Sequence, residues 1–145
     1  MANRWSDVLR FIGRSLDAEE AQRVRIRGGD ALDVAWQQKD GAARNSSYGQ
    51  LDMVRLREQA PLLRRAVVAP SKGEREELLR TLGQELDEQN VQIITIVERP
   101  GSYEVRCSGD GEILDRFYSV AELRELSEKR RALRGTGATE TEPAR

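Results

Sequence analysis

The chain has 145 residues, of which 38% are hydrophobic and 34% charged, and its net charge at pH 7 is −1. This length suits one ordinary domain or two very small ones, and the charge balance excludes a global cationic field that would attract nucleic acid or an anionic membrane. The chain has no histidine and one cysteine, which excludes a Ser-His-Asp or Cys-His catalytic site and an internal disulfide.

The sequence also bears on location. No apolar run approaches the ~20 residues that a transmembrane helix needs. Residues 1–13 lack the uninterrupted apolar segment of a secretory signal, and a single cysteine fits a reducing compartment. We therefore expect a cytoplasmic protein without membrane contact.

The first expected element is an amphipathic helix near the N-terminus. Its apolar residues recur at the spacing of one helix face: Trp5, Val8, Leu9, Ile12 and Leu16. Strands are expected at 22–27 and 32–36, followed by a polar segment at 43–47 that is a loop or a weak edge strand. A helix over 50–60 should be kinked or stopped at Pro61, because proline lacks the backbone N–H.

The second half repeats this order. Leu78, Leu79, Leu82 and Leu86 predict a helix, and strands are expected at 91–97, 103–107 and 113–119 before a closing helix over 120–134. An Asp-Gly pair follows the second strand in both halves, and this pair favours a tight hairpin turn.

A comparison of the chain with itself strengthens this pattern. Residues 8–65 set against 78–135 without a gap share 14 of 58 positions, among them Gly13/Gly83, Asp17/Asp87, Asp40/Asp110 and Tyr48/Tyr118. We predict an α+β fold made by tandem duplication of an α-β-β-(β)-α unit, packed as one pseudo-twofold domain with an antiparallel sheet. The expected boundaries are 1–66 and 78–134 for the copies, 67–77 for the linker and 135–145 for a disordered tail.

The repeated residues have structural explanations. Gly13 and Gly83 lie in helix interiors, where glycine is costly, so we expect a close approach of the two first helices or of helix and sheet there. Asp17 and Asp87 end a helix before a strand, and Asp40 and Asp110 precede a turn glycine. Tyrosines at the start of each last helix are expected to pack at a helix–sheet corner, and Cys107 is expected to be a buried structural thiol.

Two groups of basic residues form the candidate binding surface. Arg23, Arg25 and Arg27 alternate with apolar residues, which predicts that all three lie on one face of the sheet. A second group lies at the ends of the last helices: Arg64, Arg65, Lys129, Arg130, Arg131 and Arg134. The first group is a solvated edge, a phosphate-contacting surface or a site for an acidic protein, and the second also complements the helix dipole.

The sequence favours a non-catalytic binding module, an interaction or adaptor protein with an unidentified protein partner. The alternative is a nucleic-acid-binding protein that uses the arginines of the first strand, although the balanced charge counts against it. Self-association is a further alternative. We expect no catalytic residues, no cofactor and no metal site, and a carboxylate-based enzyme is the least favoured hypothesis.

Overall fold

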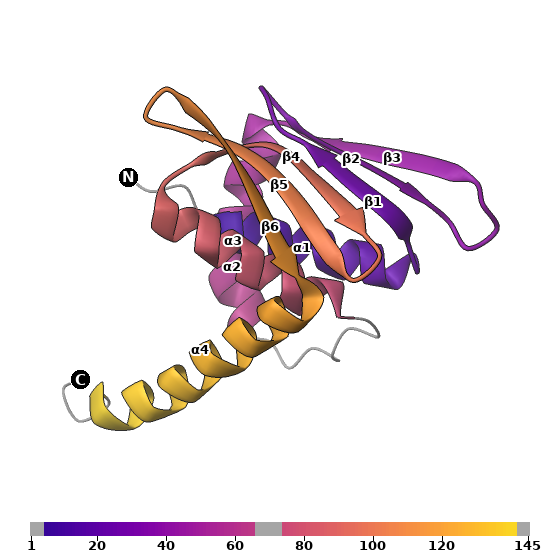
Figure 1. The fold of residues 1–145 in the computed structure, drawn as a ribbon. Helices are drawn as coiled ribbons and strands as arrows, with labels where there is room; N and C mark the ends of the chain where they lie inside the picture. The colour runs from indigo at the N-terminus through magenta and orange to yellow at the C-terminus, as the bar shows by residue number, and fades with distance from the viewer. Residues whose placement is uncertain (1–4, 66–73, 142–145) are drawn as a thin grey trace.

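The computed structural model describes residues 5–65 and 74–141, except for the side chains of residues 57, 59–65 and 134–141. The chain runs twice through a helix, three strands and a helix (Figure 1). The first run comprises α1 (Trp5–Ala18), β1 (Gln22–Arg27), β2 (Leu32–Gln37), β3 (Ala43–Tyr48) and α2 (Gln50–Arg65). The second comprises α3 (Arg75–Gln89), β4 (Gln92–Arg99), β5 (Ser102–Gly109), β6 (Glu112–Ser119) and α4 (Val120–Thr141). The expected α+β class is confirmed.

All six strands form a single antiparallel sheet. Their order is β3-β2-β1-β4-β5-β6, so the two first strands of the runs, β1 and β4, join the halves at the centre (Figure 1). In this central pair Ile26 lies opposite Ile96. The antiparallel sheet predicted from the sequence is therefore confirmed. The six strands form one continuous layer.

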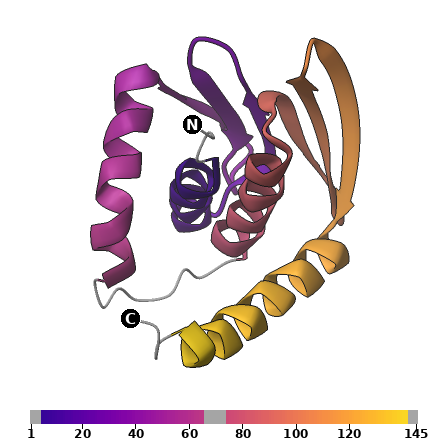
Figure 2. The same ribbon diagram turned by 90° about the vertical axis from the view of Figure 1, so that its left-hand side faces the viewer.

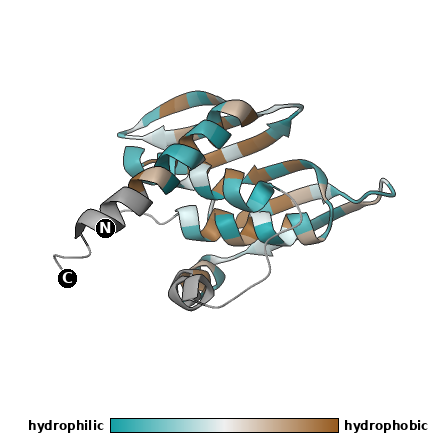
Figure 3. Ribbon diagram, turned by 90° about the horizontal axis from the view of Figure 1, so that it is seen from below, coloured by the Kyte–Doolittle hydropathy of each residue, from teal (hydrophilic) through white to brown (hydrophobic). Residues whose placement is uncertain are grey.

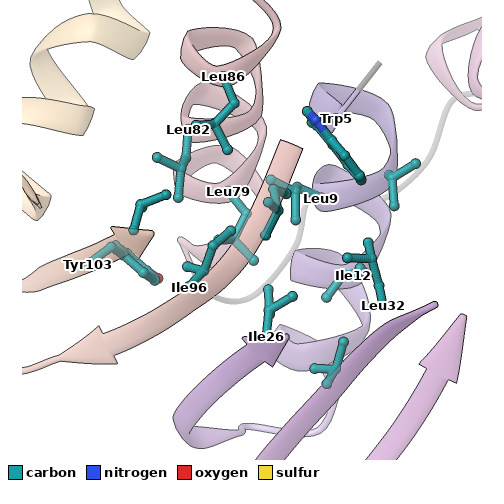
Figure 4. Packing of buried hydrophobic residues seen from close by; sticks show 14 of the residues in the cluster. Trp5, Leu9, Ile12, Ile26, Leu32, Leu79, Leu82, Leu86, Ile96 and Tyr103 are labelled. Atoms are coloured by element: carbon teal, nitrogen blue, oxygen red, sulfur yellow. The ribbon is translucent and has the colours of Figure 1, made fainter. Parts of the chain in front are cut away.

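Helices α1 and α3 lie side by side against one face of the sheet (Figure 2). Their apolar faces meet the central strands, and Leu9, Leu79 and Leu82 are fully buried with Ile26 and Ile96 (Figure 4). Each such side chain contributes about 1.5–3 kcal/mol relative to exposure. Hydrophobic and hydrophilic residues alternate along the strands (Figure 3), as expected for a sheet with one buried face.

The two helix glycines mark where α1 and α3 come closest. A Cβ at Gly13 would lie 2.5 Å from the backbone oxygen of Arg75, and a Cβ at Gly83 would lie 2.5 Å from Cα of Ser6. Both distances are far below van der Waals contact. The expected close approach of the two first helices is confirmed, and it explains why glycine is kept despite its helix cost.

The repeated aspartates do more than end helices. The Asp17 carboxylate accepts hydrogen bonds from the first two backbone N–H groups of α3, at Arg75 (3.2 Å) and Glu76 (3.0 Å). The Asp87 carboxylate does the same at the start of α1, with Trp5 N (2.7 Å) and Ser6 N (3.2 Å). Each helix therefore satisfies two of the four orphan donors at the start of the other.

Several boundaries differ from the expectation. The polar segment at 43–47 forms a full edge strand, because β2 pairs with it from Leu32 to Gln37. Helix α2 continues past Pro61 to Arg65, since one proline removes a single hydrogen bond and the helix can resume. Helix α4 continues to Thr141, although 135–145 was expected to be disordered; residues 142–145 lie outside the described chain, and so does most of the 67–77 linker.

None of the helices in the described part of the chain is long and apolar enough to cross a membrane.

Candidate binding surfaces

The face of the sheet opposite α1 and α3 is called the open face here. Strand pairing arranges its side chains in rows across the sheet, and one row runs through Ala35, Arg25, Val97, Glu104 and Phe117. Since neighbouring strands lie about 4.8 Å apart, such a row of five residues spans about 19 Å. A second row contains Asp33, Arg27, Thr95, Arg106 and Asp115.

Large apolar side chains gather on the β4–β6 half of the open face. Phe117 is 62% exposed and Ile113 is 68% exposed, which is unusual for residues of this size. A hollow of about 380 Å³ lies beside Phe117, and its lining also includes Thr95 and Val97. This half of the face therefore offers an apolar anchor point next to polar groups.

The β1 part of the open face is cationic. Arg25 and Arg27 are exposed, and within residues 5–65 and 74–141 no carboxylate forms an ion pair with either guanidinium. By contrast, Arg106 on β5 pairs with Asp115 at 2.9 Å. Two unpaired guanidinium groups thus lie next to the apolar half of the face.

Arg23 does not share this face, so the prediction that all three arginines lie together is wrong for Arg23. Between Gln22 and Arg25, β1 advances by three residues while its partner strand β2 advances by only two. A β-bulge therefore interrupts the alternation of β1. Arg23 has φ 54°, a left-handed conformation that costs a non-glycine residue about 1–2 kcal/mol. Strict alternation in the sequence gave no sign of this extra residue.

One residue of the helix-end cluster, Arg130, is engaged in the fold. Arg130 donates hydrogen bonds to Glu88 (2.8 Å) and Glu85, which ties α4 to α3. Ser127 adds a 2.7 Å hydrogen bond to Glu77. Lys129 and Arg131 are exposed on α4. The side chains of Arg64, Arg65 and Arg134 lie outside the described residues.

The contact between α3 and α4 makes the stability of the fold depend on pH. Burial alone would raise the pKa of Glu77, but hydrogen bonds from Ser127 and Arg80 outweigh it and hold the pKa below its ordinary value of 4.5. The ionised form therefore stabilises the fold above pH 4.5, and this contribution is lost as the pH falls through the folded pKa. We expect Glu77→Gln to be less stable than wild type near neutral pH and to lose less stability between about pH 5 and pH 3.

Urea unfolding of both proteins across this range measures the effect. Glu125→Gln, at an exposed position of α4, is the matched control and should follow the wild-type curve. Parallel curves for Glu77→Gln and wild type would show that Glu77 does not contribute in this way.

A larger hollow lies at one end of the molecule, and it is called the end groove here. It has a volume of about 750 Å³ and lies between the end of α1, the start of α3, the β4–β5 turn and the start of α4. Arg23 lines it, whereas Arg25 and Arg27 do not. The bulge in β1 thus separates the first arginine of the strand from the other two.

A partly buried ionic network forms part of the groove wall. Arg75 donates two hydrogen bonds of 2.7 Å to the Glu98 carboxylate, and the Tyr103 hydroxyl donates a third at 3.0 Å. Tyr103 is 2% exposed, and burial together with the neighbouring Glu98 charge raises its pKa far above the ordinary range. These three residues could not be grouped from the sequence, because they belong to no motif and come together only in the fold.

The other singled-out side chains have packing roles. Cys107 is fully buried, as predicted, and burial raises the pKa of its thiol. Tyr48 meets Phe11 edge to face with a centroid distance of 6.5 Å, and the Tyr118 hydroxyl accepts a 3.2 Å hydrogen bond from Gln89. Among the residues described, no three Cys, Asp or Glu side chains are grouped so that they could hold a metal ion.

Comparison of the chain with protein-family models, with curated proteins and with solved structures finds no significant match.

Proposed function

We propose that this protein is a non-catalytic protein-binding module whose partner docks on the open face of the sheet. The observation that carries the proposal is the row Arg25, Val97, Glu104 and Phe117, which places an unpaired cation and an exposed aromatic ring on one surface. Aromatic residues and arginine are the side chains most enriched at binding hot spots. The hollow beside Phe117 gives a partner side chain somewhere to insert.

The charge on the open face indicates the chemistry of the partner. Arg25 and Arg27 have no carboxylate partner in the described part of the chain, so an acidic residue of the partner can pair with them without breaking an existing bridge. An apolar residue of the partner, a few positions from that acidic residue, would reach Phe117. The favoured partner is therefore a protein segment that combines an apolar side chain with acidic ones.

We further propose that the domain arose by tandem duplication and has a pseudo-twofold axis at the β1–β4 pair. Three observations support this. Ile26 pairs with Ile96, its counterpart seventy positions later. Gly13 and Gly83 each face the start of the other first helix. Asp17 and Asp87 cap those same starts reciprocally. In this arrangement the two halves of the open face differ in chemistry, one cationic and one apolar.

Nucleic-acid binding is the second candidate, favoured by the unpaired Arg25 and Arg27. Two neighbouring guanidinium groups on a flat face suit phosphate contacts. Against it, Arg23 lies at the end groove and Arg130 is held by Glu85 and Glu88. Fluorescence anisotropy with duplex RNA, duplex DNA and single strands at ~50 and ~200 mM salt tests it, because phosphate binding weakens strongly with salt.

The test of the main proposal is co-purification with the tagged full chain from cells that express it naturally. We expect a specific protein to bind wild type and the control Lys129→Glu/Arg131→Glu, which reverses two exposed charges on α4. Phe117→Ser combined with Arg25→Glu should lower its recovery by about tenfold or more, which corresponds to about 1.4 kcal/mol or more. A partner that binds the open-face variant as well as wild type would contradict the proposal.

A further inference from the structure

We infer that the end groove is a second binding site, which takes a small organic anion: an acidic group carried on an apolar body. This site is separate from the open face and does not depend on the partner proposed there. It is formed where α1, α3, α4 and the β4–β5 turn converge. Its volume of about 750 Å³ falls within the range of small-molecule sites.

The first support is the backbone at Arg23. This residue is held at φ 54° at the bulge of β1, a conformation that glycine or asparagine adopts at lower cost. Bulges redirect side chains and occur next to functional sites. Arg23 is exposed, lines the groove and forms no ion pair within the described chain. The strained position therefore brings an uncompensated cation to the groove.

The second support comes from the starts of the two first helices. The carboxylates of Asp87 and Asp17 cap α1 and α3 in the same way, but the first residue of α1 is Trp5 and that of α3 is Arg75. The Trp5 indole donates to the Val91 backbone oxygen at 2.9 Å and is 6% exposed. An apolar side chain is therefore compatible with this kind of helix junction.

At the start of α3 the fold instead buries most of an ionic pair. Arg75 and Glu98 have side-chain exposures of only 19% and 17%. Desolvating two charges is costly, and apolar replacements are often equally stable, so such a pair is weak evidence for a stabilising role. A role in positioning charge at the groove wall accounts for it, because the Glu98 carboxylate fixes the Arg75 guanidinium through two hydrogen bonds along one edge.

The lining indicates the chemistry of the ligand. Arg23, Arg75, Arg99 and Arg124 face three carboxylates around the groove. Arg99 forms an exposed ion pair with Glu104, and Arg124 forms one with Glu74. Exposed ion pairs of this kind break at little cost. Guanidinium groups bind carboxylate and phosphate oxygens in bidentate fashion.

Apolar groups complete the lining. Leu78, Pro100 and Val120 also line the groove, so the ligand carries an apolar body beside its acidic group.

The experiment is a titration of the isotope-labelled full chain, followed by amide NMR, with phenyl phosphate and with benzoate. These probes distinguish a phosphate from a carboxylate as the acidic group. Benzyl alcohol tests the apolar body alone, and inorganic phosphate tests the anion alone. We expect saturable shifts at the β4–β5 turn and the start of α3 with at least one of the two acids. Both controls should bind at least about tenfold more weakly than that acid.

Arg23→Gly and Arg25→Gly form the matched pair of variants. Glycine relieves the left-handed strain at residue 23, so loss of binding there does not reflect unfolding. Arg23→Gly should weaken binding by about tenfold and Arg25→Gly by less than about twofold. The inference is overturned if neither acid binds, if inorganic phosphate or benzyl alcohol binds as well as the acids, or if Arg23→Gly binds like wild type. Because Arg25 belongs to the open face, failure here leaves the proposed protein-binding surface untouched.

Discussion

Replacing Gly13 and Gly83 together by alanine is expected to destabilise the fold by up to about 4 kcal/mol. Each new methyl group would lie 2.5 Å from backbone atoms of the opposite helix, where no side-chain rotation can relieve the clash. Overpacking costs about 1–3 kcal/mol per site. The gain in helix propensity offsets about 1 kcal/mol at each site. The clash remains, because α1 and α3 must move apart along their buried interface.

Urea unfolding followed by circular dichroism measures this effect. The double variant should lose less stability than the sum of the two single variants, because one displaced helix relaxes part of the strain at the second site. Gln84→Ala, one position beyond Gly83 and only partly buried, is the control and should change the stability by less than about 0.5 kcal/mol. A double variant as stable as wild type would show that the two helices are not packed at this distance.

The second large effect is expected from the reciprocal caps. Asp17→Ala and Asp87→Ala should each cost about 2 kcal/mol, because each removes the acceptor of two helix N–H groups that then stay unsatisfied. The double variant should lose about 4 kcal/mol if the two ends act independently. Chemical denaturation of the three variants measures these losses.

Asparagine variants separate the hydrogen bonds from the charge. Burial raises the pKa of Asp87, despite the two backbone N–H groups that it accepts from, so its ionised form is costly in the fold. Asp87→Asn keeps an acceptor without that cost and should lose less than half as much stability as Asp87→Ala. The contribution of Asp87 to stability falls as the pH rises from 3.8 through its raised folded pKa. The difference in stability between Asp87→Asn and wild type should therefore shift in favour of Asn as the pH approaches neutrality. Equal losses for Asn and Ala at pH 7 would rule out a capping role.

Periodicity predicted most of the secondary structure. The helix faces of Leu9 and Leu79 and the strands at 22–27 and 32–36 follow directly from spacing, because burial on one side imposes it. The sequence left 43–47 open between a loop and a weak edge strand, since its polar residues form a strand only through pairing with β2. Proline likewise predicted a kink or an end of the helix at Pro61, but a local preference does not decide whether the helix continues, and α2 runs to Arg65.

The candidate sites were predicted less completely. Alternation correctly placed Arg25 and Arg27 on one exposed face. It failed at Arg23, because a bulge inserts a residue and leaves no compositional trace. The end groove is built from α1, α3, α4 and the β4–β5 turn with its flanking strands, so its Arg75, Glu98 and Tyr103 become neighbours only in the folded chain.

The sequence by itself determined the α+β fold class, the order of the helices and strands, the burial of the cysteine and the need for glycine in both first helices. These properties follow from local spacing and from the absence of residue types, which act without reference to distant partners. Only the tertiary structure decided that Asp17 caps α3 and Asp87 caps α1, that Arg130 is held by α3, and that Arg23 lies apart from Arg25. Each of these depends on which segments meet, and that is fixed by burial of the whole core rather than by any short stretch of chain.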